Sequence, residues 1–235
     1  MKHTFLIKDW LSSFLSLLFP RCCVVCGRPL AKGEECICTV CNINLPRTNY
    51  HLRKDNPVER LFWGQIPLER ATSFFFYEKG SDFRLILHRL KYGGQKEIGA
   101  IMGRYMAAEL LSSHFFQGID VIIPIPLHKK KQQIRGYNQS EWIARGIAAV
   151  TGIPIDTESI LRKKNTETQT RKSVFERRDN VEGIFELQHP ETLAGKHIVI
   201  VDDVLTTGST TLACASCLVD VEDIRISILT LAMVE

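Results

Sequence analysis

The sequence lacks any uninterrupted run of about twenty apolar residues, which is the length that a membrane-spanning helix needs. It also lacks a strong excess of either charge, because 30 Lys and Arg stand against 26 Asp and Glu, a formal net charge of +4. Composition alone therefore gives no argument for a nucleic-acid partner. The 235 residues are 45% hydrophobic and 24% charged, which is typical of a globular protein with one good-sized core.

The first 21 residues are rich in Phe and Leu, but serines and charged residues interrupt the apolar positions. We interpret residues 1–21 as an amphipathic helix. A secretory signal would end in small residues, where this sequence has Pro20, Arg21 and Cys22. A lipoprotein cleavage site would have a small residue immediately before the cysteine, where this sequence has Arg21. We therefore expect the segment to dock on the protein's own core or on a partner, with membrane-surface contact as the less favoured alternative.

Six of the eight cysteines lie between residues 22 and 41, in two C-x-x-C pairs separated by eleven residues. Four thiolates at this spacing can close a tetrahedral Zn²⁺ site, which would be structural because it leaves no open position for substrate. The ligand candidates are Cys23, Cys26, Cys38 and Cys41. Cys22 and Cys36 are left over, and either could substitute as a ligand or simply pack. A disulfide framework is the disfavoured alternative, because no secretion signal accompanies the cluster.

A β-branched stretch at Ile198–Val201 predicts a buried parallel strand, and it runs directly into Asp202 and Asp203. A short loop of hydroxyl residues around one glycine follows, and the apolar run Thr211–Val219 then predicts a helix. This order aims backbone N–H groups and the positive end of a helix dipole at one point, which suits a phosphate monoester. The two carboxylates need a partner of their own, such as vicinal ribose hydroxyls or a hydrated Mg²⁺.

Taken together, the strand, the Asp pair and the TTGST loop resemble the phosphoribosyl pyrophosphate (PRPP) signature of the type I phosphoribosyltransferases. The resemblance implies that Asp202 and Asp203 hold the ribose hydroxyls at the catalytic centre and that the loop holds the 5′-phosphate. The loop residues are Thr206, Thr207, Gly208, Ser209 and Thr210. The predicted fold class is α/β, a type I phosphoribosyltransferase fold with a parallel sheet flanked by helices, preceded by a small N-terminal zinc module with four cysteine ligands.

Positive charge is concentrated between Leu127 and Val181, where twelve Lys and Arg face six Asp and Glu. A basic loop there follows a strand predicted at Asp120–Pro126, so it lies beside the Asp pair if the two strands are parallel neighbours. Residues Leu161–Val181 are expected to form a mobile flap that closes over pyrophosphate, with an ordinary solvated loop as the alternative. The candidate PRPP contacts in this part of the chain are Lys129, Arg135, Arg162, Lys163 and Arg171.

The expected organisation is an amphipathic helix at 1–21, a zinc module at 22–45, a linker or hood segment at 46–70, and a phosphoribosyltransferase-like domain at 71–235. In this last domain further strands are predicted at Ala71–Tyr77, Ile184–Leu187 and Arg225–Met233, and helices at Ser81–Tyr92, Glu97–Phe116 and Glu141–Val150. Cys214 and Cys217 form a third C-x-x-C pair, but they lie within a predicted helix and are expected to be buried small residues rather than ligands.

A narrower resemblance comes from the order of four motifs along the chain. The double C-x-x-C module, KYGG, PIPLHKKKQQIRGYNQS and VDDVLTTGST in that order are similar to the ComF family of bacterial competence proteins, over nearly the whole chain from Cys22 onward. The resemblance implies a cytoplasmic PRPP-binding protein in natural competence, with imported single-stranded DNA and other competence proteins as candidate partners.

Two function classes remain open at this point. The first is a phosphoribosyltransferase that moves phosphoribose from PRPP, with Mg²⁺, to an acceptor. The second is a non-catalytic PRPP sensor or a single-stranded-DNA-binding zinc protein, and a zinc-stabilised scaffold with a vestigial site is a weaker third alternative. No residue in the sequence identifies a general base or an acceptor pocket, so the acceptor is left unassigned.

Overall fold

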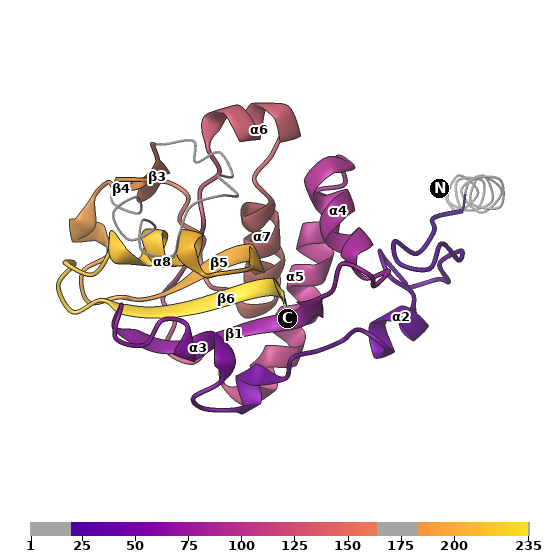
Figure 1. The fold of residues 1–235 in the computed structure, drawn as a ribbon, viewed down its shortest axis with the longest axis horizontal. Helices are drawn as coiled ribbons and strands as arrows, with labels where there is room; N and C mark the ends of the chain where they lie inside the picture. The colour runs from indigo at the N-terminus through magenta and orange to yellow at the C-terminus, as the bar shows by residue number, and fades with distance from the viewer. Residues whose placement is uncertain (1–19, 164–182, 235) are drawn as a thin grey trace, which may run out of the picture.

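The computed structural model describes residues 20–163 and 183–234 (Figure 1). The amphipathic helix expected at 1–21 lies almost entirely outside the described residues, and so does most of the expected flap, including Arg171. Among the helices of the described parts, none has the length and apolar character needed to cross a membrane.

A four-stranded parallel sheet forms the centre of the molecule, with the strand order β1-β6-β5-β2. The strands are β1 (Leu68–Tyr77), β2 (Val121–Pro124), β5 (His197–Leu205) and β6 (Arg225–Val234). Strands β2 and β5 are parallel neighbours, as expected, and Pro124 of β2 pairs with Val201 of β5. A separate antiparallel ribbon joins β3 (Ile160–Arg162) to β4 (Phe185–Leu187). The sequence analysis had placed Leu161 and Arg162 in the flap.

Helices cover both faces of the sheet, which explains why β5 reads as a continuous apolar run rather than an alternating one (Figure 1). One face is packed by α4 (Arg84–Tyr92), α5 (Glu97–Leu110) and α7 (Gln139–Thr151), and the other by α3 (Pro57–Arg60) and α8 (Ser209–Ser216). Two further helices, α2 (Thr39–Ile43) and α6 (Lys129–Arg135), belong to the cysteine module and to the segment after β2. The expected parallel sheet flanked by helices is confirmed.

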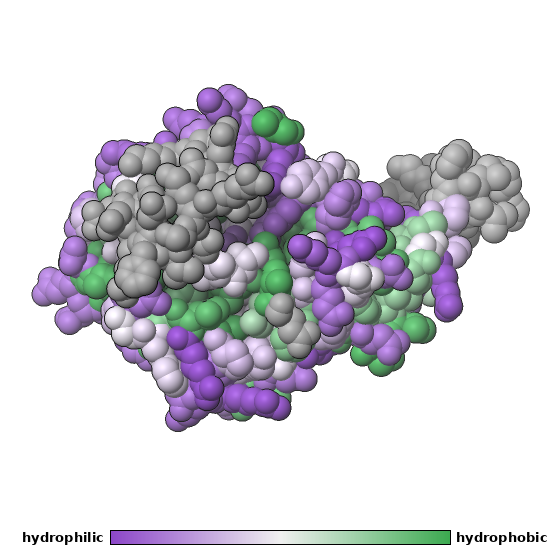
Figure 2. All heavy atoms as spheres, in the orientation of Figure 1, coloured by the Kyte–Doolittle hydropathy of each residue, from purple (hydrophilic) through white to green (hydrophobic). Residues whose placement is uncertain are grey.

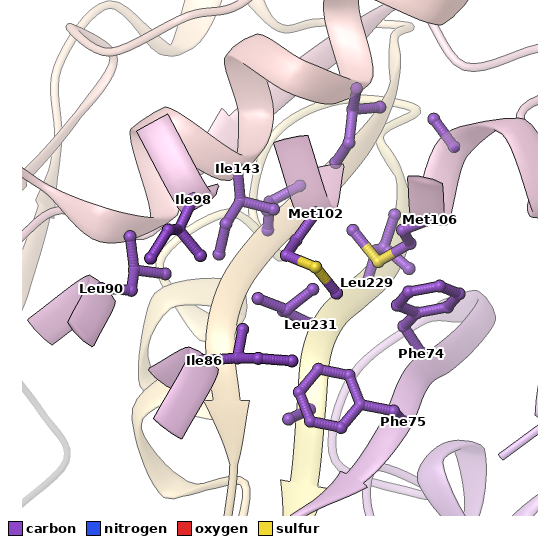
Figure 3. Packing of buried hydrophobic residues seen from close by; sticks show 14 of the residues in the cluster. Phe74, Phe75, Ile86, Leu90, Ile98, Met102, Met106, Ile143, Leu229 and Leu231 are labelled. Carbon is purple, nitrogen blue, oxygen red and sulfur yellow. The ribbon is translucent and has the colours of Figure 1, made fainter. Parts of the chain in front are cut away.

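Two methionines of α5 form the middle of the larger core cluster (Figure 3). Met102 and Met106 are fully buried, and they belong to one cluster with Leu229 of β6 and the aromatic rings of Phe74 and Phe75 from β1 (Figure 3). Unbranched thioether side chains fill irregular gaps well, which suits a site where a helix, a strand and two rings meet.

The cysteine module packs on α5 rather than standing apart from the main domain. The Cys36 thiol contacts the Met102 sulfur at 3.9 Å inside the core, and Glu35 forms an ion pair with Arg104 at the edge of this contact. Cys36 is therefore a packing residue. The buried residues of the module belong to the same hydrophobic cluster as α4, α5 and α7.

The segment at 46–70, expected to join the module to the main domain, runs alongside β1. Thr48 donates its backbone N–H to the Phe74 carbonyl at 3.1 Å. Asn56 caps α3 through Val58 and Glu59, in a reciprocal capping box, and its side-chain amide donates to the Ala71 carbonyl at 2.9 Å. These contacts fasten the segment to the sheet edge.

Two helices, α6 and α5, differ most from the sequence-based expectation. The basic loop after β2 folds as α6, because the His128 ring accepts a hydrogen bond from the Lys130 N–H at 3.2 Å and Gly136, at φ +80°, ends the helix. Helix α5 ends at Leu110 instead of Phe116. The hydroxyls of Ser112 and Ser113 donate to the last carbonyls of α5, which stops the helix there.

The crossing of α5 and α7 depends on glycine. A Cβ added at Gly146 would lie 2.1 Å from the Ala100 carbonyl oxygen, and one at Gly103 would lie 2.3 Å from the Ile143 carbonyl oxygen. The obstructing atoms are backbone, so they cannot move aside without separating the helices. This crossing fixes where the N-terminus of α7 lies at the edge of the sheet.

We predict that Gly146→Ala lowers the free energy of unfolding by about 2 kcal/mol, because the new methyl group overpacks a backbone contact. Urea denaturation followed by circular dichroism measures this difference. Gly80→Ala is the matched control, since no heavy atom lies within 4 Å of a Cβ built there. Equal unfolding free energies for the two variants would contradict the proposed close crossing.

Candidate functional site

The two carboxylates of β5 lie at the carboxyl end of the strand, where α7 begins. Asp202 accepts hydrogen bonds from the Ser140 hydroxyl at 3.0 Å and from the Asp203 backbone N–H at 2.8 Å. Ser140 is in the first turn of α7, and Asn138 caps this helix by accepting the Ser140 N–H. Ligands of open parallel sheets bind beyond this edge, so the Asp pair is in the position expected of a binding site.

A lysine from α4 supplies a charge partner that the sequence analysis did not identify. The Lys91 ammonium lies 3.0 Å from an oxygen of Asp203, and their side chains are 20% and 11% exposed. The partners expected from the sequence alone are ribose hydroxyls or Mg²⁺. The KYGG motif contains Lys91, but nothing in its spacing says that the last turn of α4 reaches the end of β5.

The environment of Asp202 favours its protonated form. Burial first, and then the negative charge of Asp203, raise the pKa of Asp202 to about 7, against the opposing effects of the Asp203 N–H, Lys91 and Ser140. A ligand that donates hydrogen bonds to both carboxylates would relieve this repulsion. Vicinal hydroxyls have the required donors.

The loop after β5 brings its hydroxyls and a helix N-terminus to the same edge. Gly208 has φ +74°, and a Cβ there would lie 3.3 Å from the ring of Phe62, so the position requires glycine. The Thr207 and Ser209 hydroxyls are 2.8 Å apart and share a hydrogen bond. Gly208 is also the N-cap of α8, so it has no side chain to cap the first N–H groups of the helix.

The other residues predicted from the sequence to contact PRPP have different surroundings. Arg162, at the end of β3, interacts electrostatically with Asp202, and burial is the main cause that lowers the pKa of Arg162. Lys163 forms an ion pair with Glu186 across the β3–β4 ribbon. Arg135 donates to the Gln139 side chain at 2.8 Å.

Lys129 is exposed at the first position of α6. Thr206 is exposed in the loop after β5, and Thr210 is exposed in the first turn of α8. Only Arg171 lies outside the described residues. The structure thus gathers the Asp pair, the loop and Arg162 at one edge, and leaves Lys163 on the surface of the ribbon.

The second group of candidate residues is the cysteine cluster. The four sulfur atoms of the two C-x-x-C pairs lie within 4.8 Å of one another, and all four residues are free thiols: Cys23, Cys26, Cys38 and Cys41. This arrangement can hold a metal ion. Although burial opposes it, backbone N–H groups that point at the Cys23 sulfur lower the pKa of Cys23 to about 7, which favours the thiolate that a metal requires. Burial and the neighbouring thiols raise the pKa of Cys41 in the absence of a metal.

The other cysteines have different environments. Cys22 is exposed, and its thiol donates to the Pro20 carbonyl. Burial raises the pKa of the Cys36 thiol to about 12, consistent with an inert packing role. Cys214 is fully buried in α8, as expected, whereas Cys217 lies at the C-cap of that helix and is only partly buried.

We predict that Asp202→Asn stabilises the protein increasingly as pH rises from about 4 to about 7. The Asp202 carboxyl ionises near pH 4 in the unfolded chain and near pH 7 in the folded protein, so the free energy of unfolding of the wild type falls between these two pH values. Asparagine does not titrate, so the variant does not lose this stability. The difference should exceed about 1 kcal/mol at pH 8. Thermal and urea unfolding between pH 4 and pH 8 measure it.

Asp220→Asn is the control for this prediction, because Asp220 is an exposed carboxylate beyond α8. It should leave the pH dependence of unfolding unchanged. If Asp202→Asn gave a constant offset at every pH, the raised pKa of Asp202 would be refuted.

Comparison with solved structures gives matches to phosphoribosyltransferases. Adenine phosphoribosyltransferase from Leishmania tarentolae is 12% identical, with a TM-score of 0.38, over 80% of this chain and 94% of that chain. Glutamine PRPP amidotransferase from B. subtilis, complexed with ADP and GMP, is 20% identical, with a TM-score of 0.37, over 58% of this chain and 26% of that chain. No protein-family model matches the chain.

Comparison with curated proteins gives closer relatives. DNA utilization protein YhgH from Escherichia coli O157:H7 is 33% identical over 209 residues, which cover 83% of this chain and 88% of that protein. Competence protein F from Haemophilus influenzae is 32% identical over 54% of this chain and 57% of that protein. Competence protein ComFC from Bacillus subtilis is 26% identical over 90% of this chain and 83% of that protein. The chain therefore belongs to the ComF family of competence and DNA utilization proteins.

Proposed function

We propose that the chain binds PRPP at the carboxyl end of β5 and acts in the handling of DNA. The observation that carries the first part is the Asp202–Asp203 pair, held at the edge of the sheet by Ser140 and Lys91 and followed directly by the loop that opens α8. The loop from Thr206 to Thr210 binds the 5′-phosphate through backbone N–H groups and hydroxyls. The two carboxylates accept hydrogen bonds from the ribose hydroxyls.

The neighbouring cations suit the pyrophosphate end of the same molecule. Arg162 is close enough to Asp202 to interact with it, and Lys129 and Arg135 belong to the helix that follows β2. With Mg²⁺, these side chains spread the charge of pyrophosphate, which is what a leaving group of this kind requires. Lys163 and Arg171 belong to the same proposed set.

Transfer of the phosphoribosyl group is the further step that this site predicts. The bond between the anomeric carbon and pyrophosphate breaks with its electron pair leaving on pyrophosphate, and an acceptor nucleophile bonds to that carbon and loses a proton. The chain's own residues bind and orient the donor and hold the leaving group. A non-catalytic PRPP sensor uses the same contacts without an acceptor.

The names of the relatives carry the second part of the proposal. Proteins called DNA utilization protein and competence protein are 26% to 33% identical to this chain over most of its length. We infer a role for this chain in natural competence, in the cytoplasm, where single-stranded DNA and other competence proteins are its partners. PRPP binding and DNA handling are separate activities that separate assays can resolve.

We propose a structural Zn²⁺ in the cysteine cluster, held by Cys23, Cys26, Cys38 and Cys41. Four sulfurs within 4.8 Å of one another match the donor set of a closed tetrahedral site. The ion would be structural, since its four positions are filled by protein ligands and none is open to a substrate. Its effect is to stabilise the module that packs on α5.

We predict that calorimetric titration of PRPP with Mg²⁺ gives binding to the zinc-loaded protein and a loss of at least about tenfold in affinity for Asp202→Asn, Asp203→Asn, because both ribose contacts are weakened. Asp220→Asn, an exposed carboxylate outside the site, is the matched control and should bind like the wild type. Absence of PRPP binding to the wild type would sink the proposal, and equal binding by the double variant would place the ligand elsewhere.

We predict about one Zn²⁺ per chain, and its loss when Cys38 is replaced by serine, since three thiolates and a hydroxyl bind the ion more weakly. Metal content is measured by a chromogenic zinc assay after denaturation, and thermal unfolding is followed with and without a chelator. Cys22→Ser is the control, because this thiol is exposed and outside the cluster. Full zinc content in Cys38→Ser would show that the ligand set is different.

A further inference from the structure

A pocket of about 410 Å³ lies between the end of α4 and one side of α6. Lys91, Tyr92 and Gly94 form one wall, and Lys131, Ile134 and Arg135 form the other. The α6 residues are spaced i, i+3 and i+4, so they share one face of that helix. The volume is in the range of pockets that hold one small organic ligand.

The lining combines positive charge with exposed apolar surface. Three of the six lining residues are cationic and none is acidic, so the pocket favours an anion. Ile134 is 86% exposed, more than any other large hydrophobic residue in the described parts of the chain, and Tyr92 is 70% exposed. The hydropathy surface shows an isolated green group over α6 among purple hydrophilic residues (Figure 2).

The tyrosine is held as a stacking surface. The Arg135 guanidinium lies 5.5 Å from the centre of the Tyr92 ring, and the His88 ring lies beside it at 5.4 Å. Arg135 is held in turn by the Gln139 side chain at 2.8 Å. A planar ligand can extend this arrangement by stacking on the ring or on the guanidinium plane, which is how proteins bind unpaired bases.

We propose that this pocket binds a nucleotide unit, with the base against Tyr92 and Ile134 and the phosphate near Arg135 and Lys131. An acidic lipid or an apolar peptide fits less well, because the exposed apolar surface is limited to two side chains with cations on both walls. The unit is either a free mononucleotide or one residue of a single strand. The pocket lies outside the loop after β5, since none of the six lining residues belongs to that loop, but it shares Arg135 with the proposed pyrophosphate contacts.

The pocket nevertheless adjoins the Asp pair. Lys91 lines the pocket and also forms the 3.0 Å ion pair with Asp203. A bound phosphate near Lys91 would compete with Asp203 for the same ammonium group. Occupation of the pocket therefore weakens the ion pair between Lys91 and Asp203, which gives the two sites a direct electrostatic connection.

Fluorescence anisotropy with a labelled short oligothymidylate and the full zinc-loaded chain tests the proposal. Tyr92→Ala should weaken binding about tenfold, since one base loses its stacking partner, and Tyr92→Phe should stay within about twofold of the wild type. Ile134→Ser should weaken binding in the same direction. Because both side chains are largely exposed, these variants keep the fold, which circular dichroism and thermal unfolding verify.

Trp63→Ala is the matched control, because Trp63 is also an exposed aromatic residue, 55% exposed, with the Arg60 guanidinium 5.7 Å from its ring centre. It should leave oligothymidylate binding unchanged. If thymidine monophosphate displaces the labelled oligothymidylate, and does so less well in Tyr92→Ala, a free nucleotide is sufficient for binding. If only unlabelled oligothymidylate displaces it, the pocket requires a strand.

Three results would overturn the proposal: no oligothymidylate or mononucleotide binding by the wild type, equal binding by Tyr92→Ala and the wild type, or an equal loss in Trp63→Ala. The variant Asp202→Asn separates the two sites, since it removes a proposed ribose contact and keeps the ion pair between Lys91 and Asp203. It should therefore weaken PRPP binding and change oligothymidylate binding much less. Absence of PRPP binding in the wild type with normal oligothymidylate binding would refute the proposed function and leave the pocket standing.

Discussion

The ion pair between Lys91 and Asp203 is the contact on which the arrangement of the candidate site depends. Two adjacent carboxylates at the end of a buried strand repel each other, and burial adds to that cost, which the raised pKa of Asp202 expresses. Lys91 offsets the charge from one side, and Ser140 donates a hydrogen bond from the other. Helices α4 and α7 must therefore both be in place to offset the negative charge at the end of β5, where Asp202 still tends to bind a proton.

The close crossing of α5 and α7 also helps to position the candidate site. Gly103 and Gly146 let the two helices approach until backbone atoms touch, and this sets the depth at which Ser140 meets Asp202. The cysteine module packs on the same α5 through Cys36 and Met102. A single helix thus connects a candidate metal site to the packing beneath the candidate ligand site.

The sequence was sufficient to predict the parallel sheet, the Asp pair at its edge and the grouping of the cysteines, because each depends on a local pattern: a β-branched run, a glycine loop, a C-x-x-C spacing. It was not sufficient for Lys91, since its contact with Asp203 joins positions far apart in the chain. It also missed α6, whose basic composition suggested a loop and whose boundaries depend on His128 and Gly136. Roles of individual residues toward PRPP stay predictions.

The strand order has a consequence for how the chain is made. Among the strands of the described residues β1 pairs only with β6, and the two are separated by nearly the whole length of the domain. During synthesis the segment around Thr48 and helix α5 can contact β1 early, but the strand that pairs with its other edge is the last to be made. That edge of β1 therefore stays unpaired through most of translation, and it leaves a row of backbone hydrogen-bonding groups open in the unfinished chain.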